Sequence, residues 1–225
     1  RFINNPRHIE VQVVGDSHGN AIHIGERDCS LQRRHQKVIE ESPAILLNDE
    51  TRAKLHDVAV KATKYLKYEG AGTFEFLADD KQNIYFMEMN TRLQVEHPVS
   101  EMVSGIDIVE LMIKVAEGEK VPPQESIKFR GHAIECRITA EDPNSFLPCP
   151  GKVTQWMVPG GRNVRVDSHV YTNYIVPPHY DSMIGKLIVW GRDRNKAINI
   201  MKRALAEFEV EGIKTTIPFH QKMME

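Results

Sequence analysis

Two glutamates lie on stretches that the sequence predicts to pair as strands, and together they could hold a metal ion. The stretches cover residues 74–76 and 85–97. A polar turn between them would set Glu75 opposite Glu88, and alternation along a strand places Asn90 and Arg92 on the Glu88 face. Opposed like charges destabilise a sheet, whereas Mg²⁺ takes carboxylate oxygens. A hairpin with a solvated acidic face would show the same spacing.

An earlier strand is expected over residues 7–14, where apolar and polar side chains alternate. Its polar positions are His8, Glu10 and Gln12. A turn over residues 15–20 and a short strand over residues 21–24 would complete a hairpin. His8 and Glu10 could line a site, although polar residues on an outer face are the commoner case.

Basic side chains are concentrated in the stretch that follows, residues 26–37. The basic residues are Arg33, Arg34, His35 and Lys37. Basic runs often bind polyanions, but this one is short and has acidic neighbours, which favours a small anion such as a nucleotide phosphate. A solvated, ion-paired strand is the alternative.

Helices are expected where apolar residues recur at the helical period. The first covers residues 49–68, capped by Asn48 or Asp49 and ended by Gly70. The next begins after Asp107 and runs to Gly118. Pro122-Pro123 marks a boundary, beyond which four strands and a single helix are expected. The strands cover residues 133–138, 152–157, 164–167 and 186–190, and the helix covers residues 195–208.

The composition excludes several classes of protein. Among 225 residues, 29 Lys+Arg oppose 31 Asp+Glu, so nucleic acid is not an expected partner. Three cysteines without C-x-x-C spacing argue against a disulfide framework or a zinc site and fit a reducing compartment, the cytoplasm. No apolar run approaches the roughly 18 residues of a membrane span. Because the chain begins without Met, we expect it to belong to a longer protein.

Five stretches, taken in order, resemble biotin carboxylase, a family of ATP-grasp ligases. They are residues 26–37, 70–76, 88–99, 131–138 and 177–186. The resemblance covers the whole chain and implies an α+β fold. Residues 1–130 would form the catalytic half of an ATP-grasp fold, an antiparallel sheet with helices, and residues 131–225 the biotin carboxylase C-terminal domain. The family's N-terminal domain and mobile lid match no part of this sequence.

The resemblance also implies a reaction and its cofactors. The protein would use ATP with Mg²⁺ or Mn²⁺, bicarbonate, and biotin on a carrier protein, and it would pass through carboxyphosphate. Glu75, Glu88 and Asn90 would hold the metal ions that bridge the ATP phosphates. The residues that match nucleotide contacts are Gln32, His35, Leu77, Lys37 and, beside that pocket, His8.

The bicarbonate and biotin sites follow from the same resemblance. The bicarbonate pocket would comprise Lys37, Arg92, Gln94, Val95 and Glu96. Glu96 is the expected general base for the bicarbonate proton. Arg92 would stabilise the biotin enolate, because a developing oxyanion needs a fixed cation, and Arg137 matches a residue near the biotin ureido group. Lys37, Arg92, Glu96 and Arg137 would thus be the catalytic residues.

The implied partners are biotin carboxyl carrier protein, carboxyltransferase subunits and a second copy of the chain. Acetyl-CoA carboxylase of fatty acid synthesis is the first expectation for the parent assembly, with pyruvate or propionyl-CoA carboxylase as alternatives. A carbamoyl phosphate synthetase-like ligase would share the carboxyphosphate chemistry, and a non-catalytic module is a third alternative. The run from Arg92 to His97 favours biotin carboxylase over a carbamoyl phosphate synthetase-like ligase. The presence of Lys37, Arg92 and Glu96 argues against a non-catalytic module.

Overall fold

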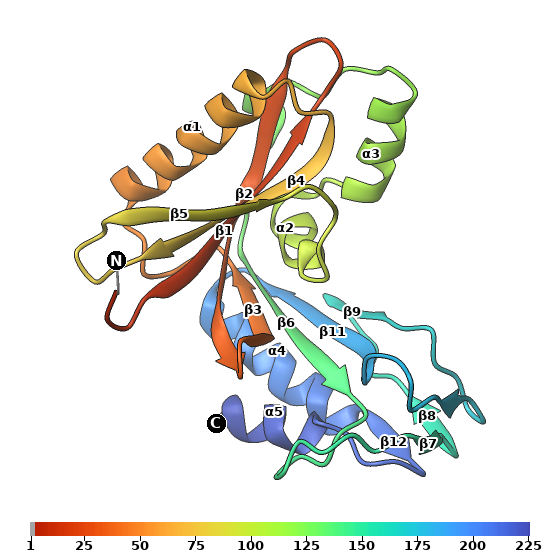
Figure 1. Cartoon of the computed structure of the whole chain (residues 1–225). Coiled ribbons are helices and arrows are strands. Elements are labelled where there is room, and N and C mark those ends of the chain that lie inside the picture. Colours follow the sequence, from red (N-terminus) through yellow and green to blue (C-terminus); the bar gives the residue numbers. More distant parts are fainter. Residues whose placement is uncertain (1–2) are drawn as a thin grey trace. The chain divides into compact units, whose positions relative to one another are not determined.

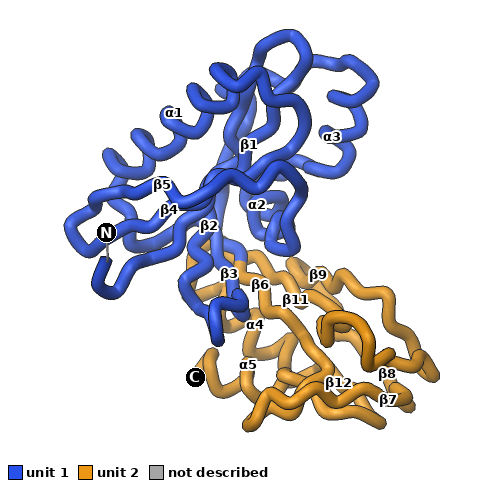
Figure 2. The backbone as a smooth tube through the Cα atoms, viewed as in Figure 1, with its two compact units in different colours: residues 1–133 blue, residues 134–225 orange. Residues whose placement is uncertain are grey.

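The computed structural model describes residues 3–225. The chain divides between Ala133 and Ile134 into two compact units (Figure 2), a few residues beyond the expected boundary at residue 130. Each unit combines antiparallel strand pairs with helices, so the predicted α+β class is confirmed. No helix among the described residues has the length and apolar character that crossing a membrane requires.

The sheet of the first unit has the strand order β5-β4-β1-β2-β3, and each neighbouring pair is antiparallel (Figure 1). The strands are β1 (Arg7–Gly15), β2 (Ala21–Arg33), β3 (Gln36–Ser42), β4 (Gly70–Ala78) and β5 (Ile84–Asn90). The predicted turn between β4 and β5 is confirmed, and the Asp79 amide donates to the Asn83 carbonyl at 3.0 Å. Strand β1 therefore lies at the centre of this part of the sheet.

Helices bury both faces of the β1 strand. The helices of the first unit are α1 (Asp49–Tyr65), α2 (His97–Ser104), α3 (Ile108–Ala116) and the short 3₁₀ helix η1 (Gln124–Ser126). Val13 packs in the core that includes Leu55 of α1. Its neighbour Val14 packs in the core that includes Ile108 and Leu111 of α3. Because successive side chains point to opposite faces, both faces of β1 are covered.

The stretch expected as one strand over residues 85–97 ends early. Strand β5 stops at Asn90, and helix α2 begins at His97. Pro98 occupies the first turn of α2, where its missing N–H and fixed φ suit a helix start. The strand expected over residues 21–24 is longer than predicted, since β2 continues to Arg33.

The first helix also differs from its prediction. Asn48 caps it as expected, accepting from the Thr51 amide at 2.8 Å. The helix ends at Tyr65, however, and Lys67 takes a left-handed conformation with φ of 50°, so Gly70 opens β4 instead of ending the helix. Helix α3 agrees with expectation, because the Asp107 side chain accepts from the Glu110 amide.

The second unit contains the strand order β6-β11-β9 and two small two-stranded sheets, β10-β7 and β12-β8. The strands are β6 (His132–Thr139), β7 (Gly151–Lys152), β8 (Gln155–Met157), β9 (Val164–Asp167), β10 (Ile175–Val176), β11 (Met183–Gly191) and β12 (Glu209–Glu211), and the helices are α4 (Arg194–Glu207) and α5 (Ile217–Met223). The expectation of a single helix is wrong. Helix α5 has only 7 residues, too few to show a helical period.

Candidate active site

Three polar side chains of β1, namely His8, Glu10 and Gln12, are covered by protein. Glu10 and Gln12 have no exposed surface, and the His8 side chain is 13% exposed. These side chains therefore do not form a solvent-exposed outer face, the commoner arrangement for polar residues of a strand. Since burying a charge is costly unless it is paired, these side chains require partners from neighbouring elements.

Arg27 of β2 supplies the central partner. Its guanidinium is fully buried and donates to Glu10 Oε2 from Nε at 3.2 Å and from Nη2 at 3.1 Å. Its other acceptors are Gln12 at 2.8 Å, Gln94 at 2.8 Å, Ser100 at 3.1 Å and Thr73 at 3.2 Å. Arg27 was not predicted as a site residue. The signal lies in the sheet register, where Glu10 and Arg27 are direct partners.

Lys37 of β3 brings three carboxylates together. Its Nζ donates to Glu96 Oε1 at 2.7 Å and to Glu75 Oε1 at 3.2 Å, and it also bonds Glu10. Burial alone lowers the pKa of Lys37, but the attraction of Glu10 and its neighbours outweighs burial and raises that pKa well above its ordinary value. Lys37 is therefore a permanent cation, and the predicted pair Lys37 and Glu96 is in direct contact.

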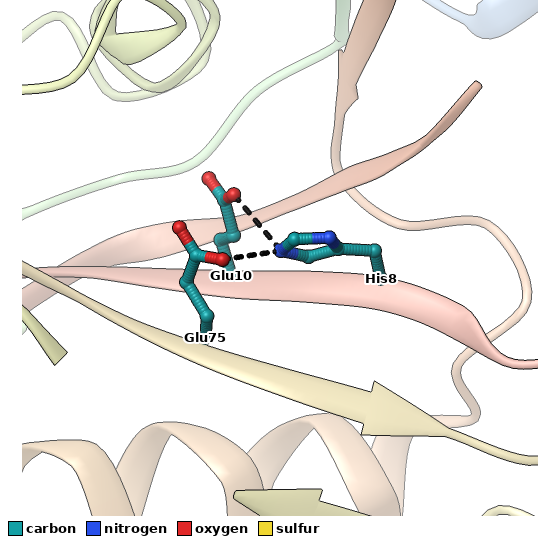
Figure 3. Close-up of side chains that lie close together, drawn as sticks. All are labelled: His8, Glu10 and Glu75. Atoms are coloured by element: carbon teal, nitrogen blue, oxygen red, sulfur yellow. Dashed lines mark ion pairs between the residues drawn. The ribbon is translucent and has the colours of Figure 1, made fainter. Parts of the chain in front are cut away.

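His8 joins the same cluster from the other side (Figure 3). Its Nε2 lies 2.7 Å from Glu75 Oε2 and 3.2 Å from Glu10 Oε1. Burial alone lowers the pKa of His8, but hydrogen bonds to Glu10 and Glu75 outweigh burial and raise it to about 9. Burial raises the pKa of each glutamate, yet the bond to His8 and nearby cations lower both to about 2.

These pKa values predict how the stability of the first unit depends on pH. The His8 contribution is fully present below pH 6.5 and is lost as the pH rises through about 9. The contributions of Glu10 and Glu75 are present above pH 4.5 and are lost as the pH falls through about 2. Melting temperatures measured as a function of pH should therefore fall at both the alkaline and the acid end of the range. His8→Gln should flatten the alkaline limb, and equal alkaline slopes in both proteins would contradict this assignment.

The predicted metal residues meet across β4 and β5. Glu75 and Glu88 are direct partners in the register, as predicted. Asn90 Nδ2 donates to Glu75 at 2.8 Å and lies 3.4 Å from Glu88. Arg92 lies beyond the end of β5, but its Nη2 still donates to Asn90 Oδ1 at 3.1 Å. The four side chains therefore form a continuous polar chain.

The donor chemistry of this group fits a hard divalent cation. The Glu88 carboxylate is exposed and forms no ion pair among residues 3–225, while Glu75 supplies a second carboxylate. Mg²⁺ prefers such oxygens. His8, Glu10 and Glu75 also lie close enough to hold an ion, but Glu10 has no exposed surface and its charge is balanced by Arg27 and Lys37. Glu75 and Glu88 are thus the better candidates.

The residues expected at the nucleotide lie partly together. Gln32 Nε2 is 2.9 Å from His8 Nδ1 and also donates to the Cys29 carbonyl at 2.8 Å. Leu77 of β4 is the register partner of His8. His35 is exposed in the turn between β2 and β3, with φ of 65°. Gln32, Leu77 and His8 thus share one end of the sheet.

The remaining predicted residues come from different units of the chain. Gln94 and Val95 lie in the segment between β5 and α2, where Gln94 is buried and donates to Glu75 at 2.7 Å. Arg137 lies in β6 of the second unit, and its carbonyl oxygen is 2.7 Å from His220 Nε2. Arg137 is thus contributed by the second unit, whereas Gln94 and Val95 belong to the first.

Comparison with known proteins matches two family models in succession. The model for "Carbamoyl-phosphate synthase L chain, ATP binding domain" covers residues 1–124. The model for "Biotin carboxylase C-terminal domain" covers residues 135–225. The two matches fall in the first and second compact units, respectively.

Several curated relatives match the whole chain. Biotin carboxylase from a Nostoc species is 57% identical, and the chain covers 51% of it. A pyruvate carboxylase subunit from Methanothermobacter thermautotrophicus is 56% identical, and the chain covers 46% of it. The chain thus spans about half the length of these relatives.

Solved structures show the same fold. A biotin carboxylase complex from Campylobacter jejuni superposes with a TM-score of 0.98 at 68% identity, covering 100% of this chain and 50% of that one. A second match is the biotin carboxylase domain dimer of a Hydrogenobacter thermophilus 2-oxoglutarate carboxylase, in complex with MgADP, ADP and bicarbonate. It superposes with a TM-score of 0.97 at 51% identity, covering 99% of this chain and 50% of that one.

Proposed function

Because this chain belongs to the biotin carboxylase family of ATP-grasp ligases, we propose that the protein containing it carboxylates biotin on a carrier protein. The reaction would consume ATP and bicarbonate and pass through carboxyphosphate. The observation that supports this most is the contact of Lys37 with Glu96 and Glu75 in a buried cluster beside exposed Glu88. That arrangement offers a cation for an anionic substrate, a carboxylate base and a metal ligand within one site.

Lys37 and Glu96 would act on bicarbonate. A compact ammonium with three donors can hold an anion that changes position during the reaction. Glu96 is 2% exposed and bonded to Lys37, so its carboxylate is held in place. Glu96 would take the bicarbonate proton as general base. Gln94 and Val95, in the same segment, would complete the pocket.

Glu75 and Glu88 would hold the metal, with Asn90 beside them. The bound metal would neutralise charge on the ATP phosphates, on which phosphoryl transfer mainly depends. Gln32, His35, His8, Leu77 and Lys37 would contact the nucleotide. A relative supports the choice of ligands, because the Hydrogenobacter domain is in complex with MgADP and bicarbonate.

Arg92 and Arg137 would bind biotin. The Arg92 guanidinium is exposed and is oriented by its bond to Asn90, so it remains accessible to a substrate. It would stabilise the enolate oxygen that develops on biotin when N1 loses its proton. Arg137 would contact the ureido group.

The partners and the location belong to the same proposal. The carrier protein would present biotin, carboxyltransferase subunits would use the product, and the second unit would form a homodimer in the cytoplasm. We take residues 1–130 as the catalytic half of the ATP-grasp fold and residues 131–225 as the C-terminal domain. Acetyl-CoA carboxylase is the first choice of assembly, and the similarity to a pyruvate carboxylase subunit makes that enzyme the alternative.

One assay tests the proposed function directly. The complete protein that contains this chain should incorporate labelled bicarbonate into free biotin, and the incorporation should require both ATP and Mg²⁺. A carbamoyl phosphate synthetase-like enzyme would consume ATP and bicarbonate without labelling biotin. The match of residues 135–225 to the biotin carboxylase C-terminal domain favours the first outcome. Absence of labelled biotin would reject the proposal.

Glu88→Gln in the complete protein should reduce turnover more than ATP affinity. The change removes one negative ligand where charge must be neutralised in the transition state, so we expect kcat to fall about 100-fold. Because Glu88 is exposed and its contact with Asn90 Nδ2 is long at 3.4 Å, the melting temperature should change little. Steady-state kinetics at saturating Mg²⁺ provide the measurement. An unchanged kcat would remove Glu88 from the metal site.

A further inference from the structure

The Gln94 side chain bridges two groups of opposite charge. Its Oε1 accepts from Arg27 Nη2 at 2.8 Å, and its Nε2 donates to Glu75 Oε1 at 2.7 Å. Gln94 is 5% exposed, so water offers little competition for either contact. The amide therefore lies between a buried guanidinium and a proposed metal ligand.

Only one orientation of this amide satisfies both neighbours. A guanidinium has donors and no acceptor, and an ionised carboxylate has acceptors and no donor. The oxygen of Gln94 must face Arg27, and its NH₂ group must face Glu75. One N–H is used by Glu75, and the other remains able to donate to an anion such as bicarbonate.

Arg27 is itself held in a single position. Its donors are distributed over Glu10 and Gln12 of β1, Thr73 of β4 and Ser100 of α2. Gln12 is anchored in turn by its bond to the Gly72 carbonyl at 3.1 Å. A fully buried guanidinium with acceptors on several elements cannot move without leaving one of them unpaired.

We propose that Arg27 is a positioning residue that orients the Gln94 amide for bicarbonate. This inference rests on the proposed function, since it assigns bicarbonate to the Gln94 pocket. Arg27 has no exposed surface and need not contact the substrate. It acts through Gln94, and it differs from Lys37 in carrying no proposed role in the chemistry.

The test uses Arg27→Lys in the complete protein. Lysine keeps the charge but not the fork of donors, so the amide of Gln94 loses its fixed partner. We expect the KM for bicarbonate to rise about tenfold, kcat to fall by up to about 100-fold, and the KM for ATP to stay within about twofold. Arg52→Lys is the matched control, because Arg52 also binds a buried glutamate, Glu26, but lies in α1.

A double-mutant cycle separates positioning from general destabilisation. In a Gln94→Leu background, Arg27→Lys should have little further effect on the KM for bicarbonate, because the amide through which it acts is gone. Equal effects of Arg27→Lys in both backgrounds, or equal increases in the KM values for ATP and bicarbonate, would overturn the proposal. If Arg27→Lys does not fold, Thr73→Val takes its place, because it removes one acceptor of the same Nη2.

Binding of ¹³C-labelled bicarbonate, followed by NMR line broadening, gives a readout that does not depend on turnover. Wild-type protein and Arg52→Lys should bind with equal affinity, and Arg27→Lys about tenfold more weakly. Equal binding by all three would overturn the role of Arg27 while leaving the proposed function intact. A wild-type protein that binds no bicarbonate would overturn both.

Discussion

Lys37→Met in the complete protein is expected to abolish biotin carboxylation, with turnover reduced about 100- to 1,000-fold. Lys37 is the group that contacts Glu10, Glu75 and Glu96 at once. Without its ammonium, bicarbonate loses the proposed cation and the glutamates lose a counter-charge. Removing one partner of a buried ion pair typically costs about 3–5 kcal/mol of stability. Labelled bicarbonate incorporation and thermal denaturation measure the two effects.

Two further variants distinguish chemistry from folding. Lys37→Arg keeps the positive charge, so it should recover most of the lost stability, but its planar fork should not restore turnover. Lys61→Met is the control, because Lys61 forms an exposed pair with Asp57 on α1. That change should affect neither property, since exposed pairs contribute little. Full turnover by Lys37→Met would exclude Lys37 from the reaction.

Residues 1–225, assayed alone, are expected to carboxylate free biotin at least about 100-fold more slowly than the complete protein. This chain contains the proposed charged groups, but it spans about half the length of its relatives. The resemblance to the family implies a lid that closes over ATP and excludes water. With water present, each electrostatic contact is weakened by the higher dielectric constant, and carboxyphosphate is exposed to hydrolysis.

The measurement compares both proteins at equal concentration in the labelled bicarbonate assay. Calorimetric titration with ATP should also show weaker binding by residues 1–225. Circular dichroism of the isolated chain provides the control that it is folded. Turnover by this chain that equals that of the complete protein would show that closure over ATP is not needed for the reaction.

The hairpin that carries Glu75 and Glu88 could be predicted from the sequence because its determinants are local. A polar turn and alternating side chains predict the two strands, although a β-bulge beside Glu75 completes the pairing, because the register set by the turn alone would place Glu75 opposite Met87. The caps at Asn48 and Asp107 were predictable for the same reason, since each depends on a residue three positions away. The family resemblance then assigned roles to these residues that spacing alone left open.

The buried cluster was decided by the tertiary structure. Nothing local distinguishes Glu10 from a solvated strand residue, because its burial depends on the two strands and the helices that cover β1. Arg27 looks like one charge among many until the register sets it beside Glu10. Lys37 likewise meets carboxylates that are 27, 38 and 59 residues away in the sequence. A charge in such a place is stable only when distant partners converge on it, and local sequence patterns do not encode that convergence.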